Sequence, residues 1–185
     1  MSGILEITGA LLALAYLVLA TMRRWWAWVP YTLSSLLYFP VFWESGLIFN
    51  ALLQLFFVGM GVRGLMSWRD EGALVAPVEW PANRHIKLVA LWFLAALSLG
   101  LATSYTSVAW IAFADAAIAV GSIVATYLTV ERVVQNWWYW LVIDAAASIT
   151  FVFQGLWVSG CLYAVYCILC VWGLLTWRRA APCSE

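Results

Sequence analysis

Polar and aromatic side chains recur at every fourth position of one apolar segment near the C-terminal end of the chain. Asn136, Trp140, Asp144 and Ser148 follow this spacing, so in an α-helix they lie along one face. The indole can stack on a flat ring and attract a cation. The carboxylate can balance positive charge, and the amide and hydroxyl can hydrogen-bond ring substituents. This stripe predicts a binding surface for a flat, polar or cationic heterocycle.

Three acidic residues, Glu6, Asp115 and Asp144, lie inside apolar segments with no basic residue at a matching depth. A charge within a bilayer is costly and usually marks a pathway, although a hydrogen bond to a neighbouring helix is the structural alternative. At about 1.5 Å per residue, Asp144 lies roughly 15 Å and Asp115 roughly 10 Å along its helix. We therefore predict that Asp115 and Asp144 line a pathway, whereas Glu6 is near enough to the edge to reach the interface.

Other candidate binding groups lie in two further apolar segments. Asn50 and Gln54 are one helical turn apart on one face, and Tyr163 lies in the last apolar segment. The sequence contains no Gly-rich phosphate loop, H-E-x-x-H motif or recognisable Ser/His/Asp constellation. Cys167 and Cys170 form a C-x-x-C pair, but no second pair is near enough in the sequence to complete a metal shell. We therefore expect no enzyme activity, no metal and no cofactor.

The composition places these groups in a membrane protein. Hydrophobic residues make up 66% of the 185 positions and charged residues 10%, against about 25% charged residues in an average soluble domain. So few charges cannot cover a surface in water, and the formal net charge of zero argues against a nucleic-acid partner. The first apolar segment contains Glu6 and lacks the basic start and cleavage site of a signal peptide, so we expect it to remain as a helix.

Seven apolar segments are long enough to cross a bilayer as helices, which takes about 20 residues each. The runs are continuous rather than alternating, so β-barrel strands are not expected. The sequence therefore predicts an all-α polytopic membrane protein with seven transmembrane helices. Their expected ranges are Ile4–Met22, Trp25–Trp43, Leu47–Ser67, Lys87–Thr103, Val108–Val130, Val134–Trp157 and Ser159–Trp177.

The basic residues indicate the orientation of the chain. With seven spans, the Lys and Arg residues gather at one face of the membrane, and the loops at the opposite face carry none. Loops rich in Lys and Arg favour the cytoplasmic side. We therefore predict an inner-membrane protein with its N-terminus outside and its C-terminus in the cytoplasm.

The beginning and the end of the chain match at an offset of 109 residues. The matched pairs are Gly64 and Gly173, Trp68 and Trp177, Arg69 and Arg178, Trp28 and Trp137, and Glu6 and Asp115. Agreement among rare Trp, Arg and acidic residues favours a duplication over chance. We predict a first three-helix repeat over residues 1–69, a cytoplasmic linker and connector helix over 70–107, and a second three-helix repeat with a cytoplasmic tail over 108–185. Parallel repeats of this kind hold their cargo between them.

Several of these segments are similar to the PnuC family of bacterial vitamin transporters. Residues 136–144 read Asn-Trp-Trp-Tyr-Trp-Leu-Val-Ile-Asp, which resembles the family segment E/Q-N-W-x-x-W-x-x-x-D/N. The terminal Gly173…Trp177-Arg178 and the segment over residues 52–57 are similar to family segments as well. The resemblance implies a 3+1+3 arrangement like a full-length relative of the SWEET sugar transporters, assembled as a homotrimer. It also implies facilitated diffusion of an unphosphorylated vitamin, which a cytosolic kinase then traps.

The resemblance also suggests which residues contact the cargo. Carried over by position, these are Gln54 together with Asn136, Trp137, Trp140 and Asp144. With the groups found above, the predicted substrate-binding residues are Asn50, Gln54, Asp115, Asn136, Trp137, Trp140, Asp144, Ser148 and Tyr163.

The cargo predicted first is nicotinamide riboside, the best-known cargo of the family. The segment over residues 63–68 reads Arg-Gly-Leu-Met-Ser-Trp. It departs from the segment Tyr-Gly-Trp-x-x-Trp, which is frequent at this place in the nicotinamide riboside carriers that the chain resembles. The start of the chain is similar to the thiamine branch of the family. Thiamine uptake by the same mechanism is therefore the alternative, followed by riboflavin uptake or a proton-coupled carrier. The expected partners are the vitamin, the lipid bilayer and further copies of the chain.

Overall fold

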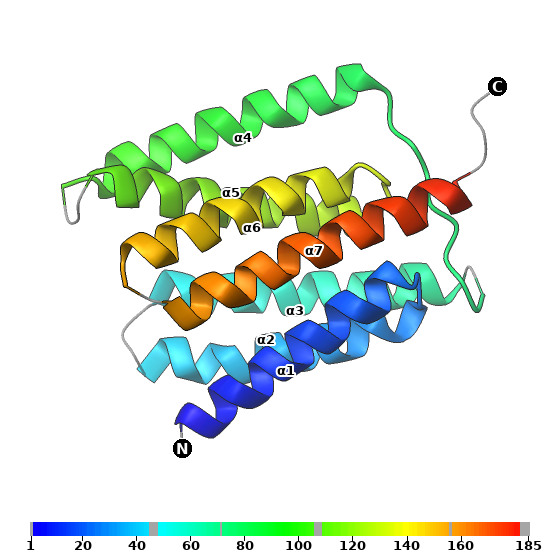
Figure 1. Cartoon of the computed structure of the whole chain (residues 1–185), viewed down its shortest axis with the longest axis horizontal. Helices are drawn as coiled ribbons and strands as arrows, with labels where there is room; N and C mark the ends of the chain where they lie inside the picture. Colours follow the sequence, from blue (N-terminus) through cyan, green and yellow to red (C-terminus); the bar gives the residue numbers. More distant parts are fainter. Residues whose placement is uncertain (1, 45–47, 71, 106–108, 156, 182–185) are drawn as a thin grey trace. The chain divides into compact units, whose positions relative to one another are not determined.

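The computed structural model describes residues 2–44, 48–70, 72–105, 109–155 and 157–181 (Figure 1). Within these ranges the chain is all-α, which confirms the predicted class. The elements are α1 (Ser2–Thr21), the short 3-10 helix η1 (Trp25–Ala27), α2 (Trp28–Glu44), α3 (Ile48–Arg69), α4 (Ala82–Thr103), α5 (Ala109–Val130), α6 (Asn136–Phe153) and α7 (Trp157–Ala180).

Five of the seven α-helices found in the described residues, α1, α3, α4, α5 and α7, are long and apolar enough to cross a membrane. Helix α2 has 17 residues and contains Pro40. Helix α6 has 18 residues, and its first turns carry Asn136 and four aromatic side chains. The membrane crossing of α2 and α6 therefore stays a prediction. The span starts expected at Leu47 and Val108 lie outside the described residues.

Two helix boundaries differ most from the expected ranges. Helix α4 begins at Ala82 rather than Lys87, because the polar residues before Lys87 form its first turn directly after a proline. Helix α6 ends at Phe153 rather than Trp157. Gly155 has a left-handed φ of 78°, a conformation that glycine adopts at little cost and that ends a helix.

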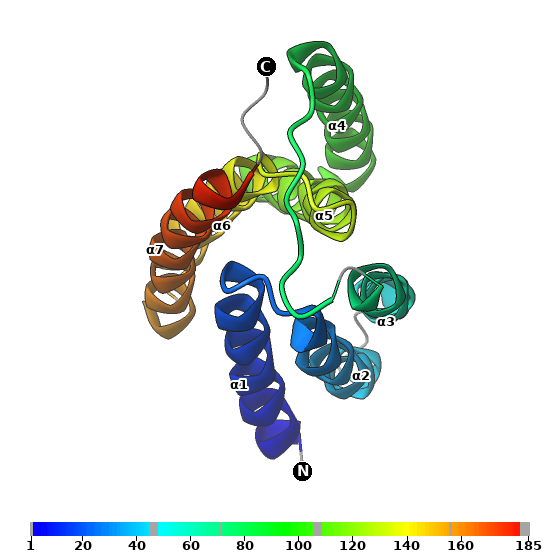
Figure 2. The same cartoon turned by 90° about the vertical axis from the view of Figure 1, so that its right-hand side faces the viewer.

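The described residues divide into two compact units, residues 1–76 and 77–185. In the first unit α1 packs against α2 and α2 against α3. In the second unit α4 packs against α5, α5 against α6 and α6 against α7. Figure 2 looks along the helices and shows α4 to α7 following one another in chain order.

The two units have matching turns at the offset of 109 residues found in the sequence. Helices α1 and α5 end at the matched residues Thr21 and Val130. Two positions later, Arg23 and Arg132 have left-handed φ angles of 59° and 62°. Such angles are uncommon for residues other than glycine, so this match is a specific feature of the two turns.

The predicted Trp and Gly pairs form the same packing motif in each unit. Trp28 meets Trp68 edge to face, with ring centroids 5.2 Å apart, and Trp137 meets Trp177 at 5.5 Å in the same way. A glycine, Gly64 on α3 in the first unit and Gly173 on α7 in the second, lies against the first Trp ring, where a Cβ atom would overlap it. The four indole rings are fully or almost fully buried. Each three-helix group is therefore closed by a Trp–Gly–Trp contact.

Within each unit, a residue of the segment that joins α3 to α4 is hydrogen-bonded to the matched turn of that unit. Val75 N donates to the backbone carbonyl of Arg23 at 3.0 Å, and the guanidinium Nη1 of Arg23 donates to Val75 O at 3.2 Å. Val78 N donates to Arg132 O at 2.9 Å, and Val134 N donates to Val78 O at 2.9 Å. The carbonyl groups of the two left-handed residues are thus both used by the linker.

Candidate functional site

The carboxyl group of Asp144 is buried between α6 and α7. Asp144 is 5% exposed, and the thiol of Cys170 on α7 lies within hydrogen-bond distance of Oδ2 at 3.4 Å. Within the described parts of the chain, no Lys or Arg pairs with this carboxyl group. A carboxylate between apolar helices is destabilised when no cation lies near it. A cationic ligand that binds beside it would balance the charge.

The side chains of Asn136 and Trp140 meet at a buried hydroxyl of α5. Thr129 Oγ1 lies 3.1 Å from Asn136 Oδ1 and accepts the indole N–H of Trp140 at 3.1 Å. Asn136 Nδ2 also donates to Val133 O at 2.6 Å, and Asn136 is fully buried. The amide of Asn136 is therefore used inside the protein, whereas the half-buried Trp140 keeps part of its ring accessible.

The stripe on α6 therefore winds around the helix instead of facing one neighbour. Asn136 and Trp140 bond to α5. Asp144 and Ser148 bond to α7, where Ser148 Oγ donates to Gly160 O at 2.8 Å. With 3.6 residues per turn, side chains four apart drift by about 40° at each step. Over three steps this drift is large enough to carry the stripe from the α5 side to the α7 side.

The remaining predicted residues lie in different surroundings. Trp137 is 1% exposed and belongs to the Trp–Gly–Trp contact. Tyr163 on α7 packs its ring 5.3 Å from Phe151. Asp115 is exposed on α5, whereas Asn50 is exposed and Gln54 half-buried on α3, in the first unit. The structure thus brings six of the nine predicted residues into the contacts that α6 makes within the second unit.

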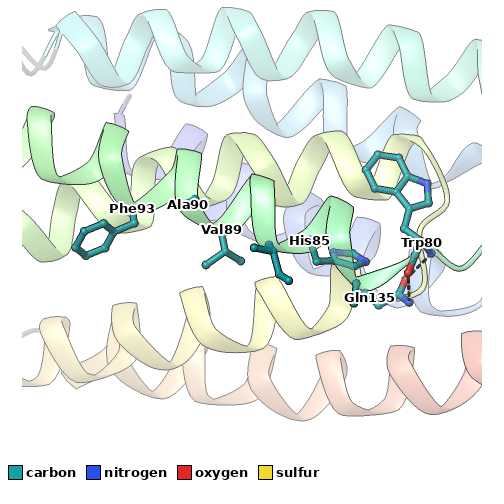
Figure 3. Close-up of a pocket in the computed structure, with 8 residues that line it drawn as sticks. Trp80, His85, Val89, Ala90, Phe93 and Gln135 are labelled. Carbon is teal, nitrogen blue, oxygen red and sulfur yellow. Dashed lines mark hydrogen bonds between the residues drawn. The ribbon is translucent and has the colours of Figure 1, made fainter.

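A groove in the second unit was not predicted from the sequence. It has a volume of about 810 Å³ and is open to the surface along α4. Figure 3 shows His85, Val89 and Phe93 along the green α4 ribbon, with Gln135 at one end bonded to Trp80. The backbone of Trp80 exchanges two 3.3 Å hydrogen bonds with the amide of Gln135. The groove is lined by residues of the linker, the first turns of α4 and the loop before α6. Because these segments are separate in the sequence, no single one of them predicts the groove.

A model of the nicotinamide mononucleotide transporter family matches residues 3–179. The chain belongs to this family, the PnuC family. The members of this family are vitamin transporters and not enzymes, so the predicted absence of enzyme activity is confirmed. Together with its apolar helices, membership makes the chain a multi-pass membrane protein.

Two curated relatives have different named cargoes. The riboflavin/roseoflavin transporter RibM of Streptomyces davaonensis is 28% identical over 93% of this chain and 83% of its own length. The nicotinamide riboside transporter PnuC of Escherichia coli is 21% identical over 96% of this chain and 86% of its own length. Membership of the PnuC family therefore leaves more than one vitamin to consider.

The fold agrees with a solved member of the PnuC family. The crystal structure of the vitamin B3 transporter PnuC aligns with a TM-score of 0.71 at 18% identity. The alignment covers 95% of this chain and 81% of that one. At this identity the likeness supports the shared fold, while the cargo has to be argued from the residues of the site.

Proposed function

We propose that this PnuC-family protein takes up an unphosphorylated vitamin across the bacterial cytoplasmic membrane by facilitated diffusion. A cytosolic kinase then traps the vitamin on the inner side. The observation that carries the proposal is the buried carboxyl group of Asp144, which has no cationic partner in the described residues, on the same helix as the partly accessible Trp140 ring. An acid and an indole suit a flat heterocycle that bears a positive charge.

The proposed cargo is nicotinamide riboside, whose pyridinium ring is flat and cationic. Thiamine is also a cationic heterocycle with a hydroxyl group, so the same residues suit it. Riboflavin is the second candidate, favoured by the 28% identity to the riboflavin/roseoflavin transporter. Its isoalloxazine ring is uncharged, so riboflavin would use the Trp ring but gain little from the Asp144 carboxylate.

We further propose how the chain is arranged in the membrane. All seven α-helices cross it in a 3+1+3 arrangement of parallel repeats, resembling the SWEET transporters and assembled as a homotrimer. Residues 1–69 and 108–185 supply the repeats, and residues 70–107 supply the linker and connector helix. The N-terminus lies outside and the C-terminus in the cytoplasm. The matched left-handed turns and the two Trp–Gly–Trp contacts support the duplication.

We propose that the cargo site uses the residues predicted from the sequence. Asp144 and Trp140 are the central pair of the second repeat, and Gln54 and Asn50 belong to the first. The full proposed set is Asn50, Gln54, Asp115, Asn136, Trp137, Trp140, Asp144, Ser148 and Tyr163.

Calorimetric titration of the purified protein with nicotinamide riboside, thiamine and riboflavin tests this proposal. In Asp144→Asn, which keeps the shape but removes the charge, we expect the Kd of a cationic cargo to rise. Loss of a charged contact costs about 1.5–3 kcal/mol, which is roughly a tenfold to 150-fold change. Asp70→Asn is the matched control, because Asp70 is an exposed acid just after α3.

The outcome also separates the cargo classes. Binding of nicotinamide riboside that weakens in Asp144→Asn but not in Asp70→Asn supports the proposal. If riboflavin bound Asp144→Asn and Asp70→Asn equally well, and neither nicotinamide riboside nor thiamine bound the protein, riboflavin would become the proposed cargo. A well-folded protein that binds none of the three would contradict the proposed cargo class.

A further inference from the structure

We propose that Thr129 is a positioning residue for the cargo site: its hydroxyl group fixes the indole of Trp140, and Asn136 acts through Thr129. This inference rests on the proposed function, because Trp140 is a proposed cargo contact. Thr129 itself is 1% exposed and lies on α5, so it acts on the cargo only through the side chain that it holds.

The hydrogen bonds around Thr129 use the proton of its hydroxyl group and one of its two lone pairs. A hydroxyl has one proton to donate and two lone pairs to accept with. Oγ1 accepts the N–H of Trp140 at 3.1 Å and has two acceptors for its proton, Ala125 O at 2.8 Å and Asn136 Oδ1 at 3.1 Å. The indole N–H therefore has a fixed acceptor within the protein.

The amide of Asn136 connects this hydroxyl to the turn before α6. Its Nδ2 donates to Val133 O at 2.6 Å, so the Oδ1 atom is turned toward Thr129. Val133 lies beside Arg132, the residue with the left-handed φ, and the neighbouring Val134 bonds to Val78 of the linker. A continuous set of hydrogen bonds thus runs from the linker turn to the ring of Trp140.

Fixing the ring in advance favours binding. A half-buried Trp with a free N–H can sample several rotamers, and a ligand that stacks on it must select one of them. With its N–H bonded to Thr129, Trp140 keeps one orientation before the cargo arrives. The accessible part of the ring is then available for stacking without a further loss of side-chain freedom.

The first unit indicates that this network is not needed to form the three-helix group. At the matching positions, 109 residues earlier, the residues are Ala20, Ala27 and Tyr31 in place of Thr129, Asn136 and Trp140. Both alanines are fully buried and have no side-chain polar group. The first unit nevertheless has the same turn and the same Trp–Gly–Trp contact. The hydroxyl, amide and indole are therefore specific to the unit that carries Asp144.

The test combines a structural and a binding measurement on protein labelled with ¹⁵N in its Trp indoles. The Trp140 N–H resonance is assigned by its absence in Trp140→Phe. In Thr129→Val, which keeps the size but loses the hydroxyl, we expect this resonance to shift and its exchange with water to accelerate. The Kd of the vitamin that binds should rise by about threefold to tenfold. In Thr129→Ser, which restores a hydroxyl, resonance and Kd should return toward the parent values.

A double variant tests the coupling even where Thr129→Val lowers the yield of folded protein. Thr129→Val should weaken binding no further in a Trp140→Phe background, because the N–H that it holds is already gone. Equal fold-changes in both backgrounds, or an unshifted Trp140 resonance in Thr129→Val, would overturn the proposal. If no vitamin binds the parent protein, the proposed function fails, while the resonance still reports separately on the Thr129–Trp140 bond.

Discussion

Replacing Gly64 or Gly173 by valine is expected to lower the melting temperature of the purified protein by roughly 5–10 °C. At Gly173 a Cβ atom would lie 2.6 Å from the Trp137 ring, and at Gly64 it would overlap the ring of Trp28. Each ring is also held against a second buried Trp, so it has no space to withdraw. Overpacking of this kind costs about 1–3 kcal/mol, as a thermal unfolding curve would record.

Gly59→Val is the matched control for this pair of substitutions. Gly59 lies on α3 like Gly64, and a Cβ atom there meets nothing within 4 Å. The control shares the change in helix propensity but not the clash. If Gly59→Val lowered the melting temperature as much as Gly64→Val and Gly173→Val, the Trp–Gly contacts would not be the reason for the loss.

Replacing Trp140 by alanine is expected to weaken vitamin binding by about ten- to a hundredfold. Stacking of a heterocyclic base on an aromatic side chain contributes about 1–3 kcal/mol in alanine substitutions, and each 1.4 kcal/mol is about tenfold in Kd. A cationic ring adds attraction to the indole face. The measurement is the Kd by calorimetry, with the melting temperature recorded on the same sample.

Trp138→Ala is the matched control on the same helix. Trp138 is exposed, and Arg178 lies over its ring at 5.9 Å, as expected of an anchor at the membrane interface. We expect little change in Kd for this variant. Equal losses of affinity at Trp138 and Trp140, or no loss at Trp140, would remove Trp140 from the site.

Much of the fold could be predicted because the sequence carries strong local signals. The seven apolar segments predict helices that the structure has in the same order. The fixed offset of Trp28 and Trp137 predicts matched positions, and the structure places both rings in equivalent contacts. Rare, large residues that recur at one spacing constrain packing, so they are informative without any homologous sequence.

The partners of the site residues could not be predicted, because they depend on contacts between helices that sequence spacing does not specify. The stripe on α6 was expected to face one direction, but the drift of an α-helix divides it between α5 and α7. Thr129 was missed because a threonine in an apolar helix usually bonds to the backbone one turn back, as it does here to Ala125. Its additional bonds to Asn136 and Trp140 come from the packing of α5 against α6.

The start of α4, which lines the groove, could not be predicted from hydropathy either. Residues 82–86 are polar apart from Ala82 and Ile86, so hydropathy assigned this stretch to the linker. In the structure it is the first turn of a helix, and His85 bonds to Tyr139 of α6 at 3.0 Å. A polar helix start that packs against another helix is decided by tertiary contacts, which composition does not reveal.

The most direct test of facilitated diffusion is the final level of vitamin inside proteoliposomes that contain only this protein. With labelled nicotinamide riboside outside and no ion gradient, we predict that the internal concentration rises to the external one and stops there. A pH gradient should leave this level unchanged, and Trp140→Ala should slow the approach to it. Accumulation above the external concentration that requires the pH gradient would contradict facilitated diffusion. Absence of flux for nicotinamide riboside, thiamine and riboflavin would contradict vitamin uptake itself.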